Sequence, residues 1–109
     1  MSATLDIAEI AYESGAPHFR YTRVKSPDGT QWLRHGLFIE YSEAGTVISE
    51  GSYSQGKEEG LWRDFHPNGK LAAEGTYRGG LEDGQWRFWN ESGAEERSVV
   101  YERGVERAA

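Results

Sequence analysis

Aromatic residues and glycines recur along this chain with a step of 24 residues. The glycines keep this step in three series, which are Gly36, Gly60, Gly84, then Gly45, Gly69, Gly93, and then Gly56, Gly80, Gly104. The aromatic series are Phe38, Trp62, Trp86, then Tyr41, Phe65, Trp89, and then Tyr53, Tyr77, Tyr101. Self-similarity at a fixed period of this size is the signature of a repeat architecture. The pattern therefore predicts an array of similar units.

Each unit is predicted to be a β-hairpin. In the middle copy, residues 61–66 form a short aromatic-bearing strand, residues 67–70 (Pro-Asn-Gly-Lys) have tight-turn chemistry, and residues 71–77 return. A helix is not indicated, because Gly60 and Gly69 bracket the aromatic residues of this strand within ten positions.

Two glycines inside the predicted strands suggest how the hairpins stack. Gly51 and Gly75 each lie two residues before a tyrosine of the repeat. Glycine usually weakens a strand, so we expect an aromatic ring of the adjacent hairpin to lie flat over the bare backbone. Since one hairpin is marginal in water, three or more must share a core. Trp62 and Phe65 are three residues apart and should point to opposite faces of the sheet.

The 109 residues (12.3 kDa) are interpreted as one domain. Three copies, 36–59, 60–83 and 84–107, follow a divergent opening copy over 1–35 that serves as a cap. In that opening copy, residues 12–15 resemble the aromatic-to-glycine turn, and Phe19 and Tyr21 supply the returning strand. The last copy departs from the pattern, because Val99 replaces the strand glycine, which suits a terminal cap. Residues 105–109 are expected to be frayed.

The opening copy also holds an insertion, with a turn of its own near Ser26 to Thr30. Two interpretations stay open for it. It is either a loop that contacts a partner or an ordinary longer connection, because insertions in repeat arrays map to loops that only sometimes bind.

The segment GLWRDFHPNGKLAAEGTYRGGLEDG, residues 60–84, resembles the MORN repeat, and more closely its bacterial variant form. The resemblance covers residues 36–104. It implies an all-β fold in which stacked antiparallel β-hairpins form an elongated single-sheet MORN-type repeat array. It also brings in a family that contains many small bacterial antitoxins of toxin-antitoxin pairs.

Charge and composition exclude several classes of function. The net charge is −6, which would repel a phosphate backbone, so nucleic acid is not an expected partner. The chain has no cysteine and therefore no disulfide framework or thiolate metal site. Residues 1–12 lack the basic and apolar regions of a signal peptide, and no apolar run is long enough to span a bilayer. We expect a cytoplasmic protein.

The candidate chemistry is sparse, and we predict no enzyme, no cofactor and no metal site. A nucleophile needs an adjacent base, yet the chain has no cysteine and no G-x-S-x-G or P-loop motif. His18, His35 and His66 do not have ligand spacing, and His66 is expected to be a solvated turn residue. Carboxylate pairs are defined by distance in space, and a thin sheet implies no deep pocket for one.

Acidic pairs form the first candidate binding surface. They occupy the same place in successive copies and should stack along one edge of the array; they are Glu58, Glu59, Glu82 and Asp83. An acidic edge would steer and hold a basic protein. The alternative is that turns are acidic simply because they face water.

Tryptophans form the second candidate surface. Trp62, Trp86 and Trp89 would anchor a partner if one aromatic face of the sheet were left uncovered. The alternative is that these rings form the core.

Together these features favour a non-enzymatic protein-binding repeat module, an antitoxin or immunity-type protein that neutralises a partner protein, with a basic toxin as one candidate partner. The alternative is a scaffold or self-assembling module, either a homodimer joined through an exposed edge strand or a membrane-associated adaptor. A membrane role ranks below protein binding, because the basic residues are interspersed with acids.

Overall fold

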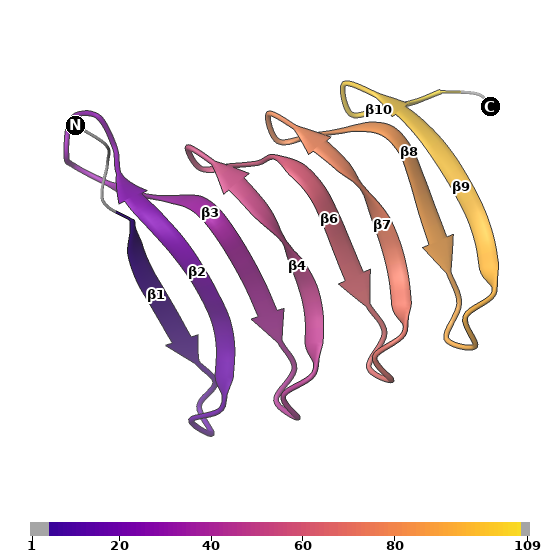
Figure 1. Ribbon diagram of the computed structural model, residues 1–109, viewed down its shortest axis with the longest axis horizontal. Helices are drawn as coiled ribbons and strands as arrows, with labels where there is room; N and C mark the ends of the chain where they lie inside the picture. The colour runs from indigo at the N-terminus through magenta and orange to yellow at the C-terminus, as the bar shows by residue number, and fades with distance from the viewer. Residues whose placement is uncertain (1–4, 108–109) are drawn as a thin grey trace.

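The computed structural model describes residues 5–107, and within that range it contains strands and no helix. The strands are β1 (Asp6–Ala11), β2 (Pro17–Lys25), β3 (Trp32–Tyr41), β4 (Val47–Ser54), β5 (Lys57–Glu58), β6 (Gly60–Phe65), β7 (Leu71–Arg78), β8 (Leu81–Trp89), β9 (Glu95–Glu102) and β10 (Val105–Arg107). They form one antiparallel sheet in the order β1-β2-β3-β4-β6-β7-β8-β9-β10, with β5 paired to β4 (Figure 1). The expected all-β array of stacked hairpins is confirmed.

Wide loops and two-residue turns occupy opposite edges of the sheet (Figure 1). Each wide loop closes in the same way, as when the backbone N–H of Gly69 donates to the carbonyl of His66 (2.8 Å). In the two-residue turns, both central residues have positive φ, including Gln55 (49°) and Arg103 (51°). This geometry matches the right-handed twist of the flanking strands. The turn glycines Gly56, Gly80 and Gly104 donate to the carbonyls of Arg34, Glu58 and Glu82.

The core is one row of residues that crosses the strands on one face, here called the ring face. In order along the sheet, the row is Ala8, Tyr21, Phe38, Gly51, Trp62, Gly75, Trp86 and Val99. A Cβ at Gly51 would overlap the Trp62 indole, and one at Gly75 would overlap that of Trp86. Ring-over-glycine stacking is therefore confirmed. Large and absent side chains alternate along the row, so the rings fit within one layer.

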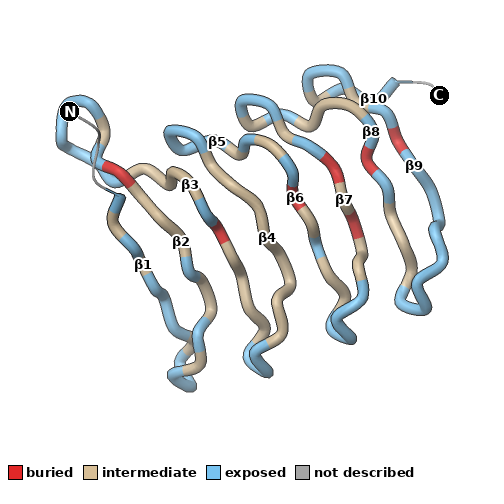
Figure 2. Tube along the Cα trace, viewed as in Figure 1, coloured by how far each residue is buried: buried red, intermediate tan, exposed pale blue. Residues whose placement is uncertain are grey.

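Tyrosines separate the stacked rings. Tyr77 meets Trp62 and Trp86 edge to face, with ring centroids 5.8 and 5.0 Å apart. Tyr53 meets Trp62 in the same way at 5.4 Å. These are favoured aromatic geometries. In Figure 2 the buried positions form a broken band across the strands, and no second layer of the described residues covers either face.

The two ends of the array differ from the sequence-based expectation. Tyr12 takes the hydrogen-bonding place of His66 in its turn, so it is one position out of line with the aromatic residues that precede the other turns. Residues 105–107, expected to be frayed, pair with residues 100–102 as β10, because the Arg103-Gly104 turn repeats the earlier turns. Residues 1–4 of the predicted cap and 108–109 of the predicted frayed end lie outside the described residues.

Candidate functional site

The acidic pairs lie at the edge of the two-residue turns, but their side chains are divided between the two faces. Glu58 lies opposite Tyr53 and Glu82 lies opposite Tyr77, so both glutamates belong to the ring face. Asp83 lies opposite Thr76, on the other face. Glu59 occupies the equivalent position, and its carboxylate accepts a hydrogen bond from the backbone N–H of Gly79 (3.0 Å). Period-2 alternation along a strand requires this division.

The ring-face acids form a longer row than the sequence analysis predicted. Glu106 on β10 lies opposite Tyr101, as Glu58 and Glu82 lie opposite their tyrosines. We call the three pairs Tyr53–Glu58, Tyr77–Glu82 and Tyr101–Glu106 the tyrosine–glutamate row. The prediction of a frayed end hid Glu106, although the step of 24 residues from Glu82 leads directly to it.

A cation stands at the start of this row. Arg34 has the position that Glu58 has one copy later, and its guanidinium donates to the Tyr53 hydroxyl (3.2 Å). The guanidinium carbon also lies 4.9 Å from the Tyr21 ring and 5.1 Å from the Phe38 ring. Such contacts attract a cation to the ring faces. The row therefore runs from a bound arginine to three glutamates.

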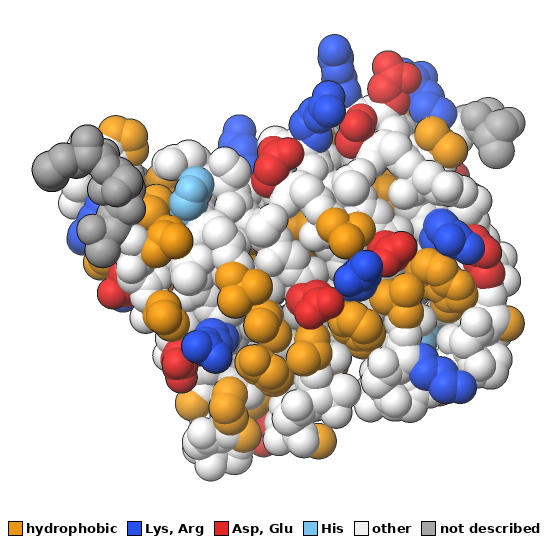
Figure 3. Space-filling view, viewed as in Figure 1, with side chains coloured by type: hydrophobic (Ala, Val, Ile, Leu, Met, Phe, Trp, Pro, Cys, Tyr) orange, Lys and Arg blue, Asp and Glu red, His pale blue; other side chains and the backbone are white. Residues whose placement is uncertain are grey.

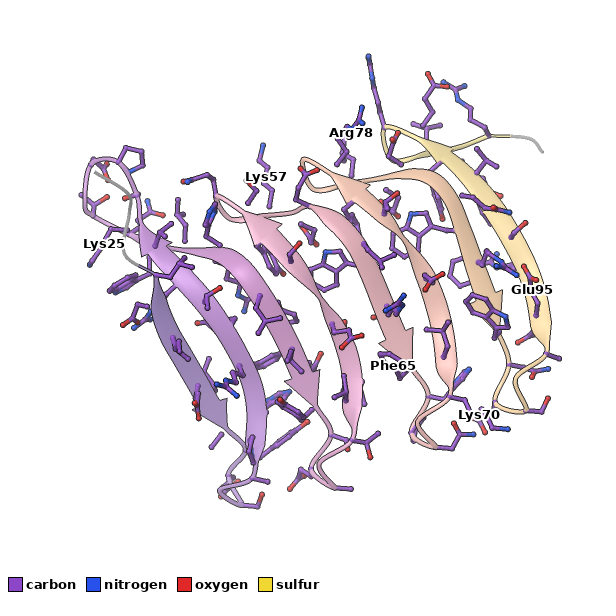
Figure 4. All side chains as sticks on the ribbon, in the orientation of Figure 1. Lys25, Lys57, Phe65, Lys70, Arg78 and Glu95 are labelled. Atoms are coloured by element: carbon purple, nitrogen blue, oxygen red, sulfur yellow. The ribbon has the colours of Figure 1, made fainter. Side chains whose placement is uncertain are left out.

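The electrostatics of the row are recorded by Tyr77. Burial, followed by the charges of Glu82 and Glu58, raises the pKa of Tyr77 to about 12. Both effects disfavour a phenolate, so the hydroxyl remains a proton donor at neutral pH. Lys57 and Arg78 extend from the same edge in Figure 4, which means that the edge as a whole carries both signs. The acidic character is specific to the ring-face row.

The three candidate tryptophans have two different environments. Trp62 and Trp86 are 8% and 6% exposed, and their Nε1 atoms donate to the carbonyls of Ser52 and Thr76 (both 3.0 Å). Both are core residues that hold neighbouring hairpins together. Trp89 lies on the opposite face, half-buried, with the guanidinium of Arg87 5.1 Å from its ring. The three rings do not form one surface.

The opposite face carries charges that neutralise one another. One row crosses eight strands in the order Glu9, Arg20, Ile39, Glu50, Arg63, Glu74, Arg87 and Ser98. Arg63 pairs with Glu74 at 2.6 Å, and this hydrogen bond raises the pKa of Arg63. Arg87 pairs with Glu95 at 2.9 Å and lowers the pKa of that carboxyl. Figure 3 shows basic and acidic side chains side by side among hydrophobic ones across the face it presents.

A shallow hollow of about 220 Å³ lies on the face of this charged row. It is lined by Leu37, Glu50, Gly51, Leu61 and Arg63. Leu37 and Leu61 are 49% and 47% exposed. The hollow is open and its two charged residues are close to each other, at 3.9 Å, so it lacks the convergent polar groups of an enclosed ligand pocket.

The Ser26 to Thr30 insertion forms a self-contained turn. The Asp28 carboxylate accepts hydrogen bonds from the Ser26 hydroxyl (2.6 Å), the Thr30 backbone N–H (3.0 Å) and the Thr30 hydroxyl (2.7 Å). These bonds, with that of Ser26 the largest, lower the pKa of Asp28 to about 2. The loop's polar groups are therefore engaged with one another.

The histidines are separate from one another. His18 contacts Glu40 (3.0 Å), and Nδ1 of His35 accepts from the Gln55 backbone N–H (3.0 Å). His66, expected to be solvated, is half-buried, because its Nε2 bonds to the carbonyl of Trp89 in the next hairpin (2.8 Å). Residues 5–107 contain no cluster of three or more His, Asp or Glu side chains arranged to hold a metal ion, and no helix that could cross a membrane.

Comparison with known proteins gives one family. The family model described as MORN repeat variant matches residues 34–55 and 58–78. The two matched segments begin at Arg34 and Glu58, the equivalent positions at the start of the tyrosine–glutamate row. No curated protein and no solved structure matches the chain. Over these two segments the chain is therefore similar to MORN variant repeats, which generally serve as non-enzymatic modules that bind proteins or membranes.

Proposed function

We propose that this protein is a non-enzymatic module that binds a basic protein partner along the tyrosine–glutamate row. The observation that carries the proposal is the threefold repetition of one cross-strand pair, a tyrosine opposite a glutamate, on the ring face. We further propose that it acts in the cytoplasm as an antitoxin or immunity-type protein that neutralises this partner.

The spacing of the row supports a protein partner. Equivalent strands of successive hairpins are separated by two strand spacings, or about 10 Å. Basic side chains seven residues apart on a helix, which rises about 1.5 Å per residue, recur at nearly the same distance. A helix with lysine or arginine at that interval could therefore meet Glu58, Glu82 and Glu106 in succession.

The chemistry of each pair supports the same conclusion. Glu58 and Glu82 are half-buried and Glu106 is exposed, so all three carboxylates can reach a ligand. Each lies beside a phenol, which offers both a ring face and a hydroxyl to a cation. The net charge of −6 would also speed the approach of a basic protein. Trp62 and Trp86 contribute by fixing the positions of the tyrosines rather than by contacting the partner.

An antitoxin role follows from what such a row would cover. A toxin that acts on nucleic acid needs a positive cleft, and a row of carboxylates at regular spacing can occupy that cleft. The test is co-expression of the full chain with the basic protein encoded beside it. We expect the pair to co-purify and the chain to relieve growth inhibition by that protein. A variant carrying Glu58→Gln, Glu82→Gln and Glu106→Gln should lose both effects.

A control variant distinguishes this role from a general effect of charge. Glu50→Gln, Glu74→Gln and Glu95→Gln remove the same number of charges from the opposite face and should leave both effects intact. Equal loss with the two variants, or no loss with either, would exclude the tyrosine–glutamate row as the binding surface.

A second candidate function is self-association. The observation that favours it is the pair of unpaired strand edges at the two ends of the sheet, β1 and residues 95–99 of β9. Unpaired strand edges are templates for pairing with another chain.

A further inference from the structure

The two ends of the sheet are complementary to each other. In the strand order each neighbour is antiparallel to the last, so β1 and β9 themselves run in opposite directions. We infer that β1 of one copy pairs with β9 of another, joining copies head to tail into a continued sheet. This inference deepens the self-association candidate and does not use the tyrosine–glutamate row.

The register of this junction follows from the internal ones. At the junction of β7 with β8, Glu74 lies opposite Arg87 and Ala73 opposite Phe88. One copy later, Ser98 and Arg97 hold the positions of Glu74 and Ala73. Ala8 faces Tyr21 as Trp86 faces Val99, so Ala8 stands at the ring position of its strand. The continued register therefore places Ala8 of the second copy opposite Val99, Glu9 opposite Ser98, and Ile10 opposite Arg97.

Side-chain size at this junction is reversed relative to the interior. Inside the array, a tryptophan stacks on a glycine that has no room for a Cβ. At the two ends the glycine position holds Val99 and the ring position holds Ala8, so neither strand could take part in a ring-over-glycine contact. Valine against alanine restores a pair of intermediate total volume, and volume-conserving exchanges are the tolerated ones in packed sites.

Charge and apolar contacts also continue across the junction. The neutral Ser98 separates Arg87 from Glu9 of the second copy, and Glu9 is followed by Arg20, so no like charges become neighbours in the charged row. On the ring face, the Arg97 guanidinium lies 4.6 Å from the Phe88 ring, and Ile10, 45% exposed, would pack against the arginine stem. The exposed apolar edge of β1 thereby gains a cover.

The contact is short, and it joins two different surfaces. Since β10 already pairs with residues 100–102, only residues 96–99 of β9 are open to residues 8–11 of β1. A contact of this length predicts weak, concentration-dependent association. A heterologous contact between translated copies does not close on itself, so growth beyond the dimer is expected.

The test is sedimentation velocity on the full chain from micromolar to millimolar concentration. We expect an average mass that rises continuously past that of a dimer. Ser98→Glu places two carboxylates opposite each other at every junction, while within the chain it faces Arg87. It should weaken association about three- to fivefold. Adding Glu9→Lys should restore association, and Ser54→Glu on an exposed turn is the control without effect.

A steric pair of variants tests the same register independently. Ala8→Trp should abolish association by placing a ring against Val99, and adding Val99→Gly should restore it by recreating the internal ring-over-glycine contact. Melting temperatures establish that each variant folds.

A protein that stays monomeric, one that stops at a closed dimer, or one whose assembly ignores both pairs of variants would overturn the inference. Growth relief by a strictly monomeric chain would leave the proposed function standing, and growing assemblies without growth relief would leave this inference standing.

Discussion

The indole of Trp86 lies on the backbone of Gly75, and its Nε1 donates to the carbonyl of Thr76, the next residue. One hairpin earlier, Trp62 makes the same two contacts with Gly51 and Ser52. Each tryptophan is therefore held by stacking and by a hydrogen bond to the preceding hairpin. Together these contacts join neighbouring hairpins into one folding unit.

Gly75→Val should destabilise the fold by several kcal/mol. The added side chain must displace the Trp86 ring; overpacking alone costs about 1–3 kcal/mol, and the Nε1 hydrogen bond is lost as well. Urea unfolding measures the change, and Ser54→Val on an exposed strand end is the control. An unchanged midpoint would contradict ring-over-glycine stacking as the source of cohesion.

Trp86→Phe should cost less than Gly75→Val but clearly more than Trp89→Phe. The smaller ring still stacks on Gly75, yet the Thr76 carbonyl loses its donor, and a hydrogen bond of this kind contributes about 1 kcal/mol. Trp89 is half-buried on the other face and its Nε1 has no hydrogen-bond partner among the described residues. Thermal unfolding of the two variants compares these effects, and equal losses would show that the Nε1 bond contributes little.

Replacing Glu58, Glu59, Glu82 and Asp83 by their amides should leave the fold intact, because exposed ion pairs contribute about 0–1 kcal/mol each. Binding to a basic partner should weaken through slower association, and the loss should shrink as salt screens the charges. Association kinetics at low and moderate salt measure this. Since Glu59 and Asp83 lie away from the ring face, Glu58→Gln with Glu82→Gln should reproduce most of the effect; a dominant effect of the other two residues would move the site to the opposite face.

Alkaline pH should destabilise the protein partly through Tyr77. Its pKa is raised from 10.0 to about 12, so the folded state favours the protonated phenol. The resulting stability is fully present below pH 10 and is lost as the pH rises through about 12. Unfolding of the wild type and of Tyr77→Phe between these values measures it. In a phenolate absorbance titration, Glu82→Gln should lower the pKa of Tyr77 while leaving it above 10, because burial is the larger cause; a return to 10 would assign the shift to charge instead.

Sequence periodicity accounts for the hairpins and the core, because glycine and aromatic positions report backbone conformation and ring stacking directly. It missed β10, since a turn with positive φ at Arg103 is unusual for a residue other than glycine or asparagine. The same error hid Glu106. Glu58 and Glu59 were grouped by adjacency, although strand alternation places neighbours on opposite faces. The environment of His66 depends on Trp89, which is distant in the sequence, and no local pattern reveals that contact.

The two-residue turns give the array a direction of assembly. The N–H groups of Gly56, Gly80 and Gly104 bond to carbonyls that lie 22 residues earlier in the chain, and never to residues that follow. On the ribosome, the acceptor for each turn has therefore already been synthesised when the turn emerges. Each new hairpin can dock on a finished one, and synthesis from the N-terminus proceeds in the same order as the sheet is built.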